Sequence, residues 1–378
     1  MCRKSKQVKM NKLQSIKRHR SINILFIKQT VYISMVSCLF IFFTGLLIYY
    51  AKLSDWHDFD VFYSAAKAAL QGESIYITVG KYNLPFWYFP WTAWFFIPFA
   101  IWSYSFSLFL YKLFTLMCSI SVIWKLSGYY RPHIKFLDIL LIISLAIPMS
   151  LQLIQVGQMD YILLWLIVII IFLIDQKKDI LAGLLIPFIW IKPHLLIVFT
   201  FLSFFKSGYR TIIVSVVLTT AMFILETIIS PTWYFEMLSL LKIGSQRIDG
   251  LKFTTFPSLL GFQENWVGTA NLPFTILLIV FALIATWRLR NLPTVSLLTV
   301  ALTASVFCAP RAYAYDLPLL IPGIIWLSYP DFKKNSWIWF VAAFTPLFSN
   351  FESSSYLVTL LVFLMSLYKA NQLLYKTT

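Results

Sequence analysis

Residues 31–50 read VYISMVSCLFIFFTGLLIYY and carry no charged side chain. An uninterrupted apolar run of ~20 residues is long enough to cross the hydrocarbon core of a bilayer as a helix. Similar runs return along the whole chain, which is 60% hydrophobic and 12% charged, with a mean hydropathy of +0.78. A soluble domain carries about 25% charged residues. The sequence therefore predicts an all-α, polytopic transmembrane helical bundle.

The segment in front of this first span is strongly basic. Residues 1–28 hold much of the excess of 31 Lys and Arg over 15 Asp and Glu, which gives the chain a net charge of +16. Lys and Arg mark the cytoplasmic side of membrane proteins and are attracted to anionic lipid headgroups. The segment has few aromatic side chains on which bases could stack, so nucleic acid is not an expected partner. We interpret residues 1–28 as a basic cytoplasmic tail and residues 29–378 as a single transmembrane domain.

The positions of Lys and Arg between the later apolar runs predict 10–12 spans, with both termini in the cytoplasm. Two long loops, residues 51–103 and 231–271, fall on the extracytoplasmic side, and the first of them is expected to be helical. Residues 180–205 lie between two basic inner loops, but they are too short for two full spans of ~20 residues each. We therefore predict two short or re-entrant helices there, which meet at an outer turn that holds Lys192 and His194.

The outer side of this topology differs chemically from the inner side. Inner loops carry simple Lys and Arg, whereas outer loops, such as a short turn expected at residues 152–160, mix acids, bases and amides. Ionisable and polar side chains that gather at one face of a membrane protein mark a candidate functional site. The outer residues concerned are Asp58, Asp60, Gln155, Gln158, Asp160, Lys192, His194, Arg311, Tyr313, Asp316 and Glu352.

The acids that follow the first span are candidates for catalysis. In the order Asp58-Phe59-Asp60, a carboxylate could act as a general base that removes the proton of an acceptor hydroxyl. One carboxylate is sufficient for a single displacement that inverts a sugar, whereas a retaining enzyme uses two. The alternatives are a solvated loop charge and a weak divalent-metal site. The residues alone leave these interpretations open.

Other outer residues also have both a structural and a functional interpretation. Lys192, His194 and Arg311 could bind a phosphate leaving group, although a Lys near the end of a span often only extends its charge to the membrane surface. Gln158 could hydrogen-bond sugar hydroxyls, or it could be an ordinary amide at a helix start. The aromatic side chains around Tyr88 could stack on a sugar ring or form the aromatic belt of a membrane interface.

Several motifs of soluble enzymes are absent from the sequence. No Walker loop, GxGxxG turn, HExxH, GxSxG or CxxC occurs. The four cysteines are scattered and give no metal-ligand or disulfide spacing. These absences argue against a nucleotide-binding loop, a zinc site and a disulfide framework, and we expect no cofactor.

A series of short motifs runs through the first outer loop in a fixed order: an Asp-Phe pair, a Tyr, paired small residues, a Leu-x-Gly, a Tyr and a Tyr-x-Pro. The residues that carry it are Asp58–Ala66, Leu70–Gly72, Ile75–Tyr76 and Tyr88–Pro90, followed later by Val156–Gln158 and Ile191–His194. This order resembles glycosyltransferase family 87, whose members are multi-span GT-C enzymes, the polyprenyl-phosphate-mannose-dependent alpha-1,2-mannosyltransferases of bacteria. The resemblance covers about the first half of the chain. The Tyr-x-Pro motif departs mildly from the family pattern, because Tyr88-Phe89-Pro90 stands where Tyr-Pro-Pro is more usual.

The resemblance implies a GT-C fold and an enzyme of the bacterial plasma membrane with an extracytoplasmic active site. It implies transfer of a hexose, first of all mannose, from a polyprenyl-phosphate donor to a hydroxyl of a glycolipid or glycan acceptor. A beta-linked donor would give an alpha-glycoside by inversion. The implied roles are general base for Asp58, with Asp60 as the alternative acid, donor-phosphate binding for Lys192, His194 and Arg311, and substrate binding for Tyr63, Tyr88 and Gln158.

Two other classes of protein share parts of this pattern. A polymerase or ligase of lipid-linked glycans also has about twelve spans and a long outer loop with Arg, as Arg247 in residues 231–271 shows, but it does not need an acid directly after the first span. A transporter or flippase would place ionisable residues near the bilayer midplane. Asp138 and Glu226 lie near span ends instead, which favours the enzyme.

Overall fold

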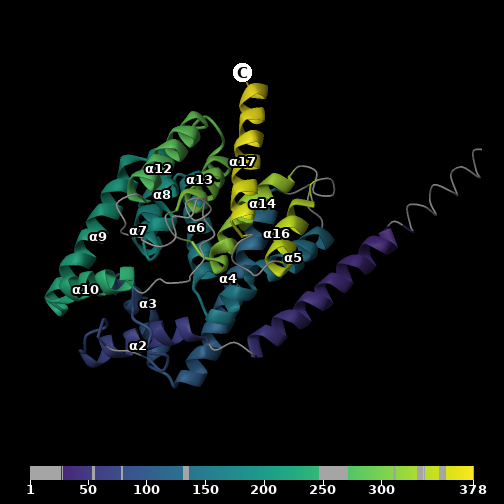
Figure 1. Cartoon of the computed structure of the whole chain (residues 1–378). Helices are drawn as coiled ribbons and strands as arrows, with labels where there is room; N and C mark the ends of the chain where they lie inside the picture. The colour runs from purple at the N-terminus through teal and green to yellow at the C-terminus, as the bar shows by residue number, and fades with distance from the viewer. Residues whose placement is uncertain are drawn as a thin grey trace, which may run out of the picture.

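The structure is a computed structural model, and it describes residues 29–52, 56–77, 80–130, 136–246, 271–309, 312–329, 337–348 and 355–377, with the single positions 27 and 335. Within these ranges the chain is built of helices joined by short turns, and no strand occurs (Figure 1). The helices are the first span Gln29–Lys52, α2 His57–Gln71, α3 Pro90–Ala100, α4 Tyr104–Tyr129, α5 Phe136–Val156, α6 Asp160–Asp175, α7 Asp179–Ile189, η1 Pro193–Leu195, α8 Ile197–Lys206, α9 Tyr209–Ile229, α10 Trp233–Gln246, α12 Asn271–Arg288, α13 Thr294–Cys308, η2 Ala314–Leu320, α14 Ile321–Ser328, α16 Trp337–Phe348 and α17 Ser355–Thr377.

Five of the described helices are long and apolar enough to cross a membrane: the first span, α4, α5, α9 and α17. Helices of this length match a hydrocarbon core of ~30 Å. The predicted polytopic all-α fold is therefore confirmed, and the chain is an integral membrane protein. The pair of short helices expected in residues 180–205 is also present, as α7 with 11 residues and α8 with 10 residues.

The interior of the bundle is formed around α13, in which every residue from Val295 to Cys308 is buried. A helix that is apolar on all sides has no polar face for contact with headgroups or water, so it is buried inside the bundle. Small residues let its neighbours come close. A Cβ placed on Gly323 of α14 would lie 2.4 Å from Cγ2 of Thr303, so α14 meets α13 at a distance that only glycine allows.

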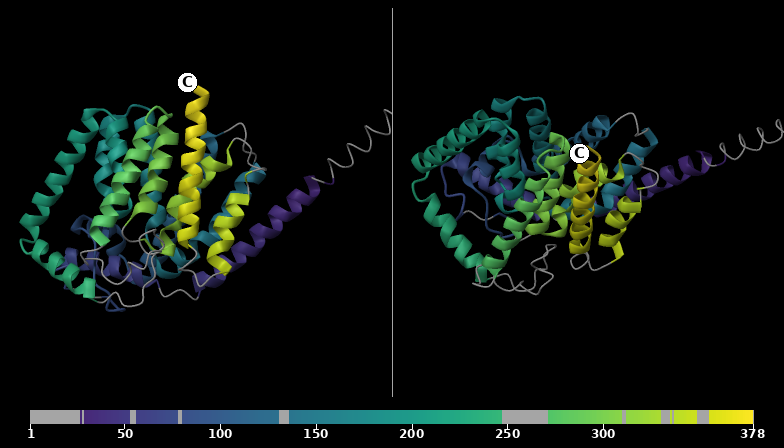
Figure 2. Two further views of the ribbon diagram at one scale, coloured as in Figure 1. Left: turned by 45° about the horizontal axis from the view of Figure 1, so that its top comes forward. Right: turned by 90° about the horizontal axis from the view of Figure 1, so that it is seen from above.

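The helix ends fall into two sets at opposite ends of the bundle. One end collects the starts of α4, α6 and α8 and the ends of α5, α7 and α13, and α2 lies across it (Figures 1 and 2). Most basic residues of the described turns lie at the other end, as Lys177 and Lys178 do between α6 and α7, and Arg290 does between α12 and α13. Charge therefore separates the two ends of the bundle, as the sequence predicts.

The first long loop contains helices, as expected. α2 buries one face, including Phe59, Phe62 and Ala66, and it ends at Gly72 with a left-handed φ of 71° that no β-carbon obstructs. α3 begins at Pro90, whose fixed φ suits a first helical position. α2 and α3 pack on each other and cap this end of the bundle.

The expected boundaries differ from the structure at three places. The outer turn predicted at 152–160 comprises only residues 157–159. Gln152 and Gln155 lie within α5, and the helix ends just before Gly157, which has a positive φ. The expected series of full spans is interrupted at residues 314–328, which are divided into η2 and the short α14. Within the second long loop, residues 233–246 form the helix α10, while residues 247–270 lie outside the described ranges.

Candidate active site

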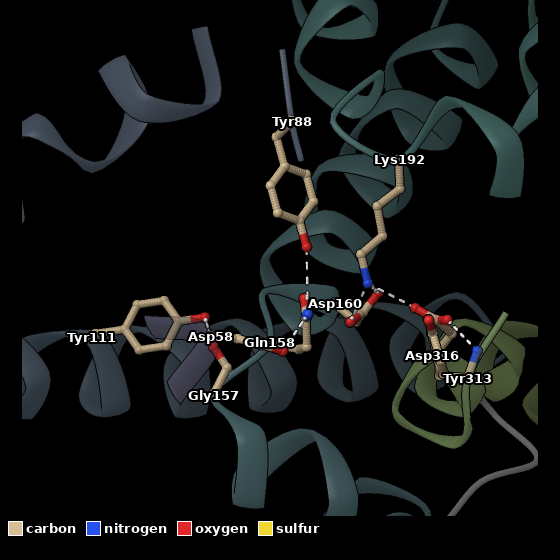
Figure 3. A network of polar contacts seen from close by, with 9 residues as sticks. All are labelled: Asp58, Tyr88, Tyr111, Gly157, Gln158, Asp160, Lys192, Tyr313 and Asp316. Carbon is tan, nitrogen blue, oxygen red and sulfur yellow. Dashed lines mark hydrogen bonds and ion pairs between the residues drawn. The ribbon is translucent and has the colours of Figure 1, made fainter. Parts of the chain in front are cut away.

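Polar side chains from five separate segments meet at the end of the bundle that α2 covers (Figure 3). We call them the polar cluster: Asp58 at the start of α2, Tyr88 before α3, Gln158 and Asp160 at the turn between α5 and α6, Lys192 at the turn between α7 and α8, and Asp316 in η2. Four of these six were predicted from the sequence to have a functional role.

The start of α2 packs against the backbone of Gly157 in the α5–α6 turn. Gly157 has a φ of 83°, and a Cβ there would lie 3.0 Å from Cε3 of Trp56 and 3.3 Å from the backbone nitrogen of Phe59. The Tyr111 hydroxyl donates to the Gly157 carbonyl at 3.0 Å. Because glycine allows both the left-handed turn and the close approach, Asp58 comes to lie beside Gln158.

Gly157→Ala should therefore displace the start of α2, and Asp58 with it, although Gly157 itself has no catalytic group. A left-handed conformation costs a residue with a Cβ roughly 1–2 kcal/mol, and the added methyl must also push Trp56 and Phe59 aside. We expect a lower thermal unfolding temperature in detergent together with reduced enzymatic activity. Gly128→Ala is the matched control, because nothing lies within 4 Å of its added Cβ. Wild-type unfolding and activity for Gly157→Ala would show that α2 does not depend on this turn.

Asp58 has the surroundings of a group that exchanges a proton. Its Oδ2 accepts a hydrogen bond of 2.5 Å from Nε2 of Gln158, and its Oδ1 lies 3.6 Å from Nε2 of His57. Burial raises the pKa of the Asp58 carboxyl above its usual value, while His57, Gln158 and Lys192 oppose that rise. The Asp58 side chain keeps 20% of its surface exposed. A partly exposed carboxylate with a raised pKa is a candidate general base.

Asp60 points elsewhere, because residues two apart on a helix lie on nearly opposite sides. It is 4% exposed, and its Oδ2 accepts from the backbone N–H of Tyr82 at 3.4 Å. A Cβ on Gly80 would lie 2.1 Å from the same oxygen, so the carboxylate packs directly on the loop. Asp60 therefore fastens residues 80–82 to α2, and Asp58 is the acid that faces the polar cluster.

Lys192 is buried and already paired. Its Nζ donates to Oδ1 and Oδ2 of Asp160, both at 2.8 Å, and to Oδ1 of Asp316 at 2.7 Å. Lys192 is 4% exposed, and the three hydrogen bonds match the three donors of an ammonium group. The sequence predicts a cation that binds a phosphate. In this arrangement the charge of Lys192 is taken up by two carboxylates, and phosphate binding by Lys192 stays a prediction.

Asp160 and Asp316 are among the polar residues predicted on the outer side, but no chemical role was predicted for either of them. Asp160 is the first residue of α6, and Asp316 also closes a capping box in which its Oδ2 accepts from the backbone N–H of Tyr313 at 2.7 Å. An acid at the start of a long apolar run, and a Tyr-x-x-Asp spacing after a turn, are the local signals that could have drawn attention to them.

Gln158 connects Asp58 to the aromatic wall of the site. Its Nε2 lies 3.4 Å from the hydroxyl of Tyr88, whose ring packs against Phe62 at 5.1 Å. Gln158 is 3% exposed, and its Oε1 has no hydrogen-bond partner among the described residues. A buried carbonyl oxygen without a donor is a place where a substrate hydroxyl could bind.

Tyr63, predicted to bind substrate, joins other parts of the fold. The Tyr63 hydroxyl donates to the carbonyl of Trp102 at 2.9 Å, and its ring packs edge-on against Tyr104. Tyr63 thus joins α2 to the start of α4. His194 lies in η1, partly exposed, two residues after Lys192. Arg311, like Glu352, lies outside the described residues. Across the described ranges no three His, Cys, Asp or Glu side chains are grouped as a metal site.

Membrane-spanning helices with an ionisable cluster where their ends meet are typical of an integral membrane protein with a functional site. The family model for glycosyltransferase family 87 matches residues 86–312, more than half of the chain, and the chain belongs to this family. It is a glycosyltransferase, as the sequence motifs predict. The matched range contains Tyr88, Gln158 and Lys192 but begins after Asp58. No curated protein and no solved structure matches the chain.

Proposed function

We propose that the protein transfers a hexose, with mannose as the first candidate, from a polyprenyl-phosphate donor to a hydroxyl of a glycolipid or glycan acceptor. The observation that carries the proposal is the position of Asp58: a partly exposed carboxylate, held by Gln158, at the end of the bundle where five segments converge. The broad activity of a glycosyltransferase rests on the family. The donor, the sugar and the stereochemistry are proposed here.

The proposed reaction is a single displacement. Asp58 takes the proton of the acceptor hydroxyl as that oxygen forms a bond to C1 of the sugar. The bond between C1 and the phosphate oxygen breaks on the opposite side, and the electron pair leaves with the polyprenyl phosphate. One carboxylate is enough for such an inversion.

The position of the α7–α8 turn relative to the bilayer suits a lipid-linked donor. α7 and α8 have 11 and 10 residues, so each rises only about 15–17 Å, roughly half of a bilayer core. The turn between them carries Lys192 and His194, so these residues can meet a phosphate whose lipid chain stays in the membrane. We propose His194 and Arg311 as ligands of that phosphate, and Lys192 as a further ligand only if it leaves its two carboxylates.

The distribution of charge supports an extracytoplasmic site in a bacterial plasma membrane. Lys177, Lys178, Lys206 and Arg290 belong to turns at the end of the bundle away from the polar cluster. By the positive-inside rule those turns are cytoplasmic. The polar cluster then lies on the other side, where lipid-linked sugars rather than nucleotide sugars are the available donors, and both termini are cytoplasmic.

A direct test compares donors with the purified full-length protein in detergent. Radiolabelled mannose on polyprenyl phosphate is expected to pass to a glycolipid acceptor fraction, whereas GDP-mannose is expected to give no product. The product should be released by an alpha-mannosidase and not by a beta-mannosidase. Transfer from GDP-mannose, or a product with retained beta configuration, would overturn the donor or the mechanism. Polymerisation of a preformed oligosaccharide would instead identify a polymerase of lipid-linked glycans.

A further inference from the structure

The proton that Asp58 accepts must leave the site before the next turnover. Asp58 is only 20% exposed, and an acceptor sugar bound to it would cover that opening. Gln158 holds Oδ2 through an N–H, and an amide N–H cannot receive a proton. The oxygen that remains for proton exchange is Oδ1.

His57 lies beside that oxygen. Its Nε2 is 3.6 Å from Oδ1 of Asp58, and 33% of its side chain is exposed, more than that of Asp58. The separation is longer than a hydrogen bond, and a small side-chain rotation or one bridging water closes it. Imidazole is the side-chain base that ordinarily exchanges protons near neutral pH. His57 therefore stands between the carboxylate and the aqueous phase.

The other groups around the pair do not offer this route. Tyr82 faces His57 edge-on, with ring centroids 6.2 Å apart, and its phenol is not a base near neutral pH. Lys192 and Asp316 act on Asp58 through their charges, but both are buried and bonded to each other. The hydroxyl of Tyr88 contacts Gln158 and not the carboxylate.

We propose that His57 is the proton exit of the site: it receives from Asp58 the proton taken from the acceptor hydroxyl and passes it to water. The inference rests on the proposed function, since it needs Asp58 as the base. In the step, the O–H bond at Oδ1 breaks, an N–H bond forms at Nε2, and Asp58 returns to its carboxylate form beside an imidazolium. A water molecule then takes the proton, and neutral His57 is restored. His57 acts only through Asp58, so it is a positioning and relay residue.

The test uses His57→Gln and His57→Ala in the full-length protein, with the polyprenyl-phosphate-mannose donor. Asp58 can still accept one proton in these variants, so the first turnover should keep nearly the wild-type rate. Later turnovers should slow by about tenfold, less than the 10²–10⁴-fold loss expected for a base itself. A burst of about one product per protein is therefore expected, with little change in KM. Added imidazole should restore the steady-state rate, more strongly in His57→Ala, where it has more room.

Lys81→Gln is the matched control, because it removes a positive charge from the same outer loop without contact to Asp58. It should show neither a burst nor stimulation by imidazole. The inference is overturned if the His57 variants turn over like the wild type, or if they are slow without a burst and without a response to imidazole. The proposed role of Asp58 as the base is tested separately, because it fails if Asp58→Asn remains active.

Discussion

Asp58→Asn is expected to lower the rate of sugar transfer by about 10²–10⁴-fold, the usual contribution of a general base. Asparagine keeps the size of the side chain and can still bond to Gln158 after rotation of its amide, but it cannot accept the proton of the acceptor hydroxyl. Protein folding should be preserved, because the side chain is partly exposed. The measurement is transfer of labelled mannose by protein whose thermal unfolding matches that of the wild type.

Asp60→Asn is the internal control for this result. Asp60 lies two residues further along α2 and packs on the 80–82 loop, where an amide oxygen can also accept the Tyr82 N–H. We expect this variant to keep most of the transfer rate. Loss of activity in Asp60→Asn with normal activity in Asp58→Asn would exchange the roles of the two acids.

The pH dependence of the wild-type rate should also show that an ionised Asp58 is required. Only the ionised form of Asp58 can act as a base, so kcat/KM should fall as the pH is lowered through its pKa. Burial raises that pKa above the ordinary value of 3.8, which moves the loss of activity to a higher pH than an exposed aspartate would give. An acidic limb at or below pH 3.8 would contradict the assignment.

Lys192→Met is expected to destabilise the protein by about 3–5 kcal/mol, the cost of removing one partner from a buried ion pair. Methionine has a similar length but leaves Asp160 and Asp316 facing each other without a cation. The measurement is thermal unfolding in detergent, followed by tryptophan fluorescence. Lys125→Met is the matched control: Lys125 is exposed and lies over the ring of Phe172 at 4.9 Å, a contact worth about 0.5–1 kcal/mol.

A second substitution separates the two roles that Lys192 could have. Lys192→Met combined with Asp160→Asn removes one positive and one negative charge, so the pair should lose less stability than the sum of the single variants. Lys192 also lowers the pKa of Asp58, so its removal should move the acidic limb of activity to higher pH. If Lys192→Met unfolds like the wild type and only raises the KM for the donor, the ammonium is a phosphate ligand and not a structural cation.

The paired state of Lys192 changes how the site is understood. Taken alone, a Lys and a His beside a proline at an outer turn suggest a cradle for phosphate. The three hydrogen bonds to Asp160 and Asp316 show that Lys192 also joins α6, the α7–α8 turn and η2. These segments carry the other members of the polar cluster next to Asp58 and Gln158, so a cation at this point holds the three segments together.

Local patterns in the sequence were sufficient for much of the architecture. Apolar length predicted the spans, and a stretch too short for two spans predicted the pair α7 and α8. Helical periodicity predicts that Asp58 and Asp60 face different sides, since two residues cover about 200° of a helix, and the family resemblance favoured Asp58 as the base. These features depend on neighbours in the chain and on the bilayer, so no knowledge of the folded bundle was needed.

The partners of the site residues were decided by the tertiary structure. Asp58 and Gln158 are 100 residues apart, and Lys192 and Asp316 are 124 apart. Nothing in the spacing of the chain says which outer turns will touch, and a lysine at a turn looks the same whether it is free or paired. The packing of α2 on Gly157 and of η2 beside α6 selects these contacts. Hydropathy placed the charged groups at one side of the membrane, but only the packed helices determined which charge each of them meets, because burial requires every ion to find a partner.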